Sequence, residues 1–216
     1  MAVMNVNPTR MELTRLKKQL STATRGHKLL KDKRDELMRQ FLEMIRENKA
    51  LREQVEAGIT DANRHFVLAS AVMQREQMDA ALLSPKQEVG VEISTRNVMS
   101  VDIPVFSPVT RTPDPSDIYP YGFAFTSFEL DDAVQRLSGL LPMMLRLAEC
   151  EKSTRLLAAE IEKTRRRVNA LEHVMIPRLQ ETIRYITMKL EENDRSSRTR
   201  LMKVMDMMLE KAHHYH

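Results

Sequence analysis

Apolar residues recur along the first and last thirds of the chain at alternating steps of three and four. Such steps average about 3.5 residues, the repeat that keeps one helical stripe facing a partner in a left-handed coiled coil. The first series, here the N-terminal seam, consists of Leu13, Leu16, Leu20, Ala23, His27, Leu30, Arg34, Leu37, Phe41, Met44, Asn48, Leu51 and Val55. The second, the C-terminal seam, consists of Leu157, Ile161, Thr164, Val168, Leu171, Met175, Leu179, Ile183, Ile186 and Leu190. The two seams predict an all-α fold, a long antiparallel two-helix left-handed coiled coil.

The ends of the two helices follow from capping residues and prolines. Asn7 can cap a first helix over residues 7–83, with Pro8 at its first helical position and Pro85 just beyond its end. At ~1.5 Å per residue this helix is on the order of 110 Å long, and it needs a partner along its seam. A second helix is predicted over residues 127–208, with bends at Pro142 and Pro177 and a frayed tail at 209–216.

The middle segment, residues 84–126, has a different pattern. β-branched residues alternate with polar ones and predict a short β-hairpin at about 89–105, with its turn at residues 95–97. Several prolines then predict an irregular loop over residues 106–121. If the helices fold back about this segment, facing residues have numbers that sum to roughly 208. Leu13 is then expected near Leu190, and Phe66 near Leu141.

The composition supports long helices and argues against an enzyme. Charged residues make up 30% of the chain, aromatic residues only 5%, and tryptophan is absent. Cys150 is the single cysteine, which excludes an internal disulfide and a cysteine metal cluster. Neither glycine-rich nucleotide-binding motif is present, and His27 lacks a second ligand at i+4. We therefore expect no cofactor, no metal and no catalytic residue. A membrane span is not predicted either, because the sequence has no run of ~18 apolar residues.

The sharpest charge cluster is Arg165, Arg166 and Arg167. Consecutive residues of a helix fan out by ~100°, so the three cannot share one partner. The cluster is either a solvated basic patch or a contact to acidic groups of another protein. Nucleic-acid binding is not expected, because no aromatic interleaving or reader motif accompanies the cluster.

Several long segments together resemble the D subunit of V-type and A-type rotary ATPases. They are residues 5–13 (NVNPTRMEL), 24–37 (TRGHKLLKDKRDEL), 162–172 (EKTRRRVNALE), 176–179 (IPRL) and 189–193 (KLEEN). The resemblance covers nearly the whole chain and is strongest over residues 5–50 and 151–194. It implies a central-stalk rotor, a non-catalytic component that couples ATP hydrolysis or synthesis in a ring of A and B subunits to ion translocation.

The resemblance also implies partners and their surfaces. The A and B subunits would surround the coiled coil, and Arg165, Arg166 and Arg167 are our hypothesis for contacts to that ring. A funnel-shaped rotor subunit on the membrane ring and the small F subunit would bind the lower end. Our hypothesis for the F contact is Phe66, Met73, Leu137 and Leu141. The chain would lie peripherally at the cytoplasmic face of the membrane.

Two other classes of protein remain open from the residues alone. A non-rotary coiled-coil scaffold would self-associate, whereas a rotor would occur as one copy per ring. A basic coiled coil that binds nucleic acid would show strongly salt-dependent retention of DNA or RNA.

Overall fold

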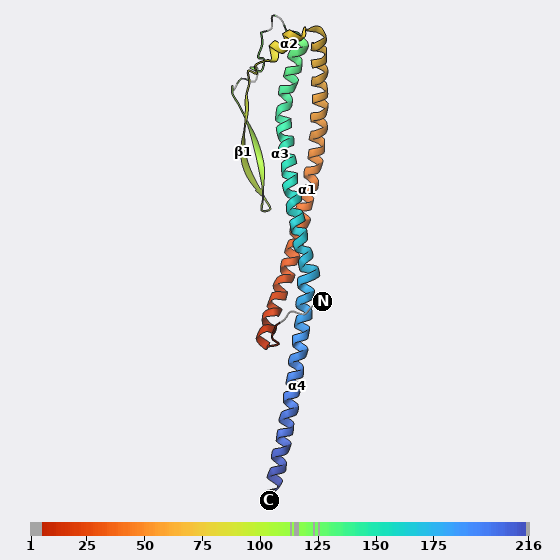
Figure 1. The fold of residues 1–216 in the computed structure, drawn as a ribbon, viewed down its shortest axis with the longest axis vertical. Helices are drawn as coiled ribbons and strands as arrows, with labels where there is room; N and C mark the ends of the chain where they lie inside the picture. The colour runs from red at the N-terminus through yellow and green to blue at the C-terminus, as the bar shows by residue number, and fades with distance from the viewer. Residues whose placement is uncertain (1–5, 113, 115–116, 123, 125, 215–216) are drawn as a thin grey trace. The chain divides into compact units, whose positions relative to one another are not determined.

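The computed structural model describes residues 6–112, 114, 117–122, 124 and 126–214, with side chains to residue 209. In chain order its elements are α1 (Arg10–Val72), α2 (Arg75–Leu82), β1 (Val89–Val98), β2 (Val101–Thr110), α3 (Phe128–Ala170), the π-helical turn η1 (Leu171–Met175) and α4 (Ile176–His214) (Figure 1). The predicted fold class, an all-α coiled coil with a small β-hairpin, is confirmed. α4 runs to His214, whereas the sequence predicted a frayed tail from residue 209.

The chain divides into two compact units. The terminal unit consists of residues 1–35 with 162–216, and the central unit consists of residues 36–161. In each unit a part of α1 pairs with helix from the second half of the chain.

The terminal unit is held together by one apolar cluster between α1 and α4. Leu16, Leu179 and Ile186 are buried, and partly buried residues pack around them, including Leu13 and Leu190. Leu13 and Leu190 thus share one cluster, as the sequence predicted. The ion pair between Arg10 and Asp194 (3.2 Å) keeps the same antiparallel order.

The π-helical turn interrupts the C-terminal seam just before Pro177. A proline ring clashes with the carbonyl of the residue four positions earlier, and a wider turn relieves that clash without ending the helix. The sequence predicted a kink at Pro177, and the structure places the irregularity in the turn Leu171–Met175. Met175, a predicted seam residue, is 50% exposed, while Ile176 is half-buried. The seam therefore takes a five-residue step from Leu171 to Ile176.

In the central unit α1 pairs antiparallel with α3. α1 ends at Val72, earlier than the predicted residue 83, because Gln74 adopts an extended backbone (φ −67°, ψ 144°). Met73, which follows α1, and Ala81 of α2 then pack with Ala69 and Leu130 in one buried cluster. Phe66, which the sequence placed near Leu141, packs on this cluster.

The β-hairpin is longer than predicted and turns at a different place. Its register pairs Val89 with Thr110 and Val98 with Val101, so strand replaces the start of the predicted loop. The turn residues Met99 (φ 51°) and Ser100 (φ 70°) both have positive φ, as a two-residue type I′ turn requires. The predicted turn at residues 95–97 is wrong. Pro113 and Pro115 of the predicted loop lie outside the described residues.

The hairpin packs alongside α3 within the central unit (Figure 1). Val101 and Ile103 of β2 are buried with Leu37 of α1 and with Leu157 and Ile161 of α3. The backbone N–H of Phe106 donates to Glu149 of α3 at 3.2 Å. These contacts fix the β2 side of the hairpin to the helices.

Pro142 lies inside α3, which continues from Phe128 to Ala170. The sequence predicted a bend or break there. A proline removes one intrahelical hydrogen bond, and the packed face of the helix offsets that loss. Leu140 is buried at 8% exposure and Cys150 at 6%, one on each side of the proline.

Candidate interaction surfaces

The structure buries the predicted seam residues to different degrees. The buried ones are Leu16, Leu37, Val55, Leu157, Ile161, Thr164, Val168, Leu179 and Ile186. The half-buried ones include Leu13, Leu20, Leu30, Phe41 and Leu171. All of these side chains are therefore occupied by packing inside the chain, and partner surfaces must be sought on the other helical faces.

Ion pairs connect α1 to α3 across the central unit. Arg146 of α3 bonds Glu47 of α1 at 2.8 Å, and Arg52 of α1 bonds Glu151 of α3. Their side chains are 28–69% exposed, so solvent screens these pairs and each contributes little to stability. Their main effect is to select one register of the two helices.

A more enclosed polar contact lies near the end of α1. His65 Nδ1 lies 3.0 Å from Glu129 and 3.5 Å from Asp132, both on α3. Arg136 bridges Asp132 and Asp61 next to it. Sequence reasoning had no signal for this group, because its members come from helices 64 or more residues apart.

Burial changes the acidity of two side chains in the central unit. Burial raises the pKa of the Cys150 thiol, which donates to the carbonyl of Met44 at 3.4 Å. Burial and the hydrogen bond from Tyr121 to Asp131 (2.9 Å) raise the pKa of the Tyr121 hydroxyl. Both groups are therefore neutral near pH 7 and act as structural contacts.

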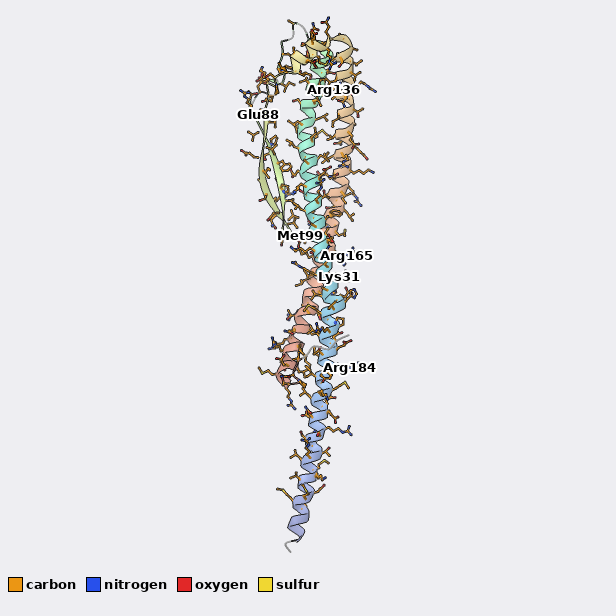
Figure 2. The ribbon with its side chains drawn as sticks, in the orientation of Figure 1. Lys31, Glu88, Met99, Arg136, Arg165 and Arg184 are labelled. Atoms are coloured by element: carbon orange, nitrogen blue, oxygen red, sulfur yellow. The ribbon has the colours of Figure 1, made fainter. Side chains whose placement is uncertain are left out.

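The arginine cluster lies on the outer surface of α3. Arg165, Arg166 and Arg167 are exposed, while Thr164 and Val168 on either side are 1% exposed. Figure 2 labels Arg165 on the helix. Arg166 pairs with Glu162 one turn earlier on the same helix. The three guanidinium groups are thus directed away from the α1 contact and are accessible to another protein.

The four residues of the predicted F contact have different surroundings. Met73 is buried in the cluster around Leu130, and Phe66 packs against that cluster. Leu137 is 37% exposed and Leu141 is half-buried, and Met144, 42% exposed, lies on the same face of α3 at the next helical step. The accessible part of the predicted surface is therefore Leu137 and Leu141, and Met144 extends it along α3.

Sequence reasoning missed a larger apolar surface near the end of α4. Its side chains are 45–68% exposed and belong to Leu201, Met202, Val204, Met205, Met207, Met208 and Leu209, here called the tail surface. Asp194 makes the last described ion pair to α1, and residues 197–209 are all exposed. The run of methionines was a usable signal, because an adaptable thioether surface suits contact with another protein.

A hollow of about 670 Å³ lies beside the π-helical turn in the terminal unit. Small α1 residues, Ala23 and Gly26, face Leu171, Met175 and Leu179 across it. The mismatch between small residues on α1 and the widened turn leaves this space open. Its rim carries Arg15 and Lys18.

Among the residues that the structure describes, no group of three or more His, Cys, Asp or Glu side chains could hold a metal ion. None of the described helices combines the length and the apolar character that a membrane span needs. The fold and its exposed surfaces define an all-α coiled-coil protein with a small β-hairpin.

Comparison with known proteins gives the family. The family model for the D subunit of ATP synthase matches residues 12–206. The V-type ATP synthase D subunit of Acetivibrio thermocellus is 63% identical over 215 residues, covering 100% of this chain and 97% of the relative. That of Clostridioides difficile is 65% identical over 212 residues, covering 98% and 95%, and that of Clostridium botulinum is 56% identical over 209 residues, covering 96% and 97%.

The chain belongs to the family of ATP synthase D subunits. The resemblance seen in the sequence is confirmed. Members of this family are components of a multi-subunit ATP synthase.

Proposed function

We propose that this chain is the central-stalk rotor of a V-type or A-type ATPase. It would couple ATP hydrolysis or synthesis in a ring of A and B subunits to ion translocation by rotating inside the ring. Family membership over nearly the whole chain is the observation that carries this proposal. The chain itself would be non-catalytic and would lie peripherally at the cytoplasmic face of the membrane.

The physics of a two-helix coiled coil suits such a role. Two helices lack threefold symmetry, so they present a different face to each catalytic interface of a surrounding ring. Coupling then requires a contact free energy that differs between shaft orientations. The exposed Arg165, Arg166 and Arg167 supply charge contacts of this kind to acidic groups of the ring.

The remaining exposed surfaces supply further contacts. The tail surface on α4 needs an apolar surrounding, which the interior of the ring would provide. The stripe of Leu137, Leu141 and Met144 would hold the F subunit. The funnel-shaped rotor subunit would bind at the lower end and connect the chain to the membrane ring.

Co-expression with the A, B and F subunits, followed by native mass measurement, tests the proposal. The expected result is one copy of this chain per hexameric ring, and no ATPase activity in the chain alone. A chain that ignores those subunits and only self-associates would favour a non-rotary scaffold instead.

A further inference from the structure

The β-hairpin has two strand edges, and the register defines which residues face outward. Val98 and Val101 flank the two-residue turn and form a hydrogen-bonded pair, so even-numbered residues of β1 bond to β2. Odd-numbered residues of β1, from Val91 to Asn97, direct their backbone N–H and C=O groups away from β2. On β2 the outward residues are the even-numbered ones.

The outer edge of β2 is closed to further strands. Pro104 and Pro108 occupy outward positions and have no N–H to offer. The N–H of Phe106, between them, already donates to Glu149 of α3. Prolines and a covering helix are the devices by which proteins block a strand edge.

The outer edge of β1 has no such protection. Residues 90–97 are all exposed, including Val91 at 41% and Ile93 at 68%. The ion pairs of the described residues include neither Glu92 nor Arg96. An exposed edge of alternating residues is a template for another strand.

We propose that this β1 edge pairs with the β1 edge of a second copy of the chain, antiparallel about a twofold axis at Ser94. Only odd-numbered residues bond outward, so an odd residue must face an odd residue. In the Ser94 register Ile93 faces Thr95 of the second copy, and Val91 faces Asn97. The product is a four-stranded sheet, which is more stable than a lone hairpin.

Charge selects this register over its neighbours. About Ser94, Glu92 faces Arg96 of the second copy, and by symmetry the contact occurs twice. An axis at Ile93 would place Glu92 against Ser94, and an axis at Thr95 would place it against Val98. An axis at Glu92 or Arg96 would bring like charges together. The free chain would thus protect its open edge, and a single copy would be released for assembly.

Sedimentation of the full chain over a range of concentrations tests the pairing. A dimer that dissociates on dilution is expected. Glu92→Arg alone or Arg96→Glu alone should raise the dimer dissociation constant about tenfold or more, and the two together should restore it. Restoration in the double variant identifies the second copy as the partner, because an unrelated strand would not carry the compensating change.

A proline variant tests the backbone bonds. Thr95→Pro removes an outward N–H that β2 does not use, so the hairpin persists while the dimer should be lost. Thr95→Val keeps the N–H and should keep the dimer. A chain that stays monomeric at every concentration overturns the proposal. A dimer whose stability Thr95→Pro does not change would also overturn it, because the two copies would then associate through their helices. The proposal fails as well if the β1 amides become protected from hydrogen exchange only when other proteins of the complex are added.

Discussion

Gly58 of α1 lies directly beneath Leu140 of α3. A Cβ built on Gly58 would lie 3.0 Å from Leu140 Cδ1 and closer still to Cδ2. A larger residue at this position would force the Leu140 side chain to shift. The contact with Leu140 gives Gly58 a packing role.

Two glycines of α1 should respond in opposite ways to alanine. Gly26→Ala meets no atom within 4 Å, so it should raise the free energy of unfolding by about 0.5–1 kcal/mol through helix propensity. Gly58→Ala gains the same propensity but overpacks Leu140 at a cost of about 1–3 kcal/mol, so a net loss is expected. Urea unfolding of both variants measures the difference. Equal stabilisation by both would show that α1 and α3 do not approach closely at Gly58.

Docking of the hairpin should depend on one side chain of β2. Ile103 is 2% exposed and packs between the helices, so Ile103→Ala should cost about 2–4 kcal/mol of docking free energy. Hydrogen exchange of the β2 amides should speed up while the helical circular dichroism stays unchanged. Ile93→Ala is the matched control, because Ile93 is 68% exposed. Loss of helix in the Ile103 variant would mean that the hairpin is required for the coiled coil.

The Cys150 thiol should react slowly at neutral pH. Burial raises its pKa, so less thiolate is present than in a free cysteine, and the thiolate is the reactive form. Alkylation of the folded chain should therefore accelerate only at a higher pH than alkylation of the urea-unfolded chain. Identical pH profiles for the two states would contradict the burial of this side chain.

The arginine cluster should matter for coupling and not for folding. Replacing Arg165, Arg166 and Arg167 with alanine should reduce ATP-driven ion transport of the assembled complex about fivefold or more, with helix content retained. The control removes the same charge from the central unit, at Arg46, Lys49 and Arg75, all exposed. Normal coupled transport in the cluster variant, or an equal loss of transport in the control, would mean that the three arginines form only a solvated basic patch and make no specific contact to the ring.

The helices could be read from the sequence because burial follows the heptad repeat, as Leu16, Leu37 and Ile186 illustrate. Local breaks were harder to predict. α1 ends at Val72 without a glycine or proline, where Gln74 adopts an extended backbone and Met73 packs into the cluster around Leu130. The hairpin turns at Met99 and Ser100, which have positive φ values although neither residue is the glycine that usually marks such a turn in a sequence. These choices depend on contacts between distant residues.

For the candidate surfaces too, the features set by the helical repeat could be predicted, and those set by contacts between distant residues could not. The exposure of Arg165, Arg166 and Arg167 follows from their position between buried seam residues. The sequence assigned Met73 to a partner contact, whereas the residue is buried, and its burial depends on where α2 folds back. The open edge of β1 became visible only once the strand register placed Pro104 and Pro108 on the opposite edge.

The burial of Cys150 has a practical consequence for spectroscopy. The chain contains no tryptophan, and its single native thiol is enclosed between α1 and α3. A cysteine introduced on an exposed face would therefore be the one site that a fluorophore labels at neutral pH, and an introduced tryptophan would be the chain's only indole emitter. Orientation and distance inside an assembled complex can thus be followed from one chosen residue at a time, without first removing native reporters.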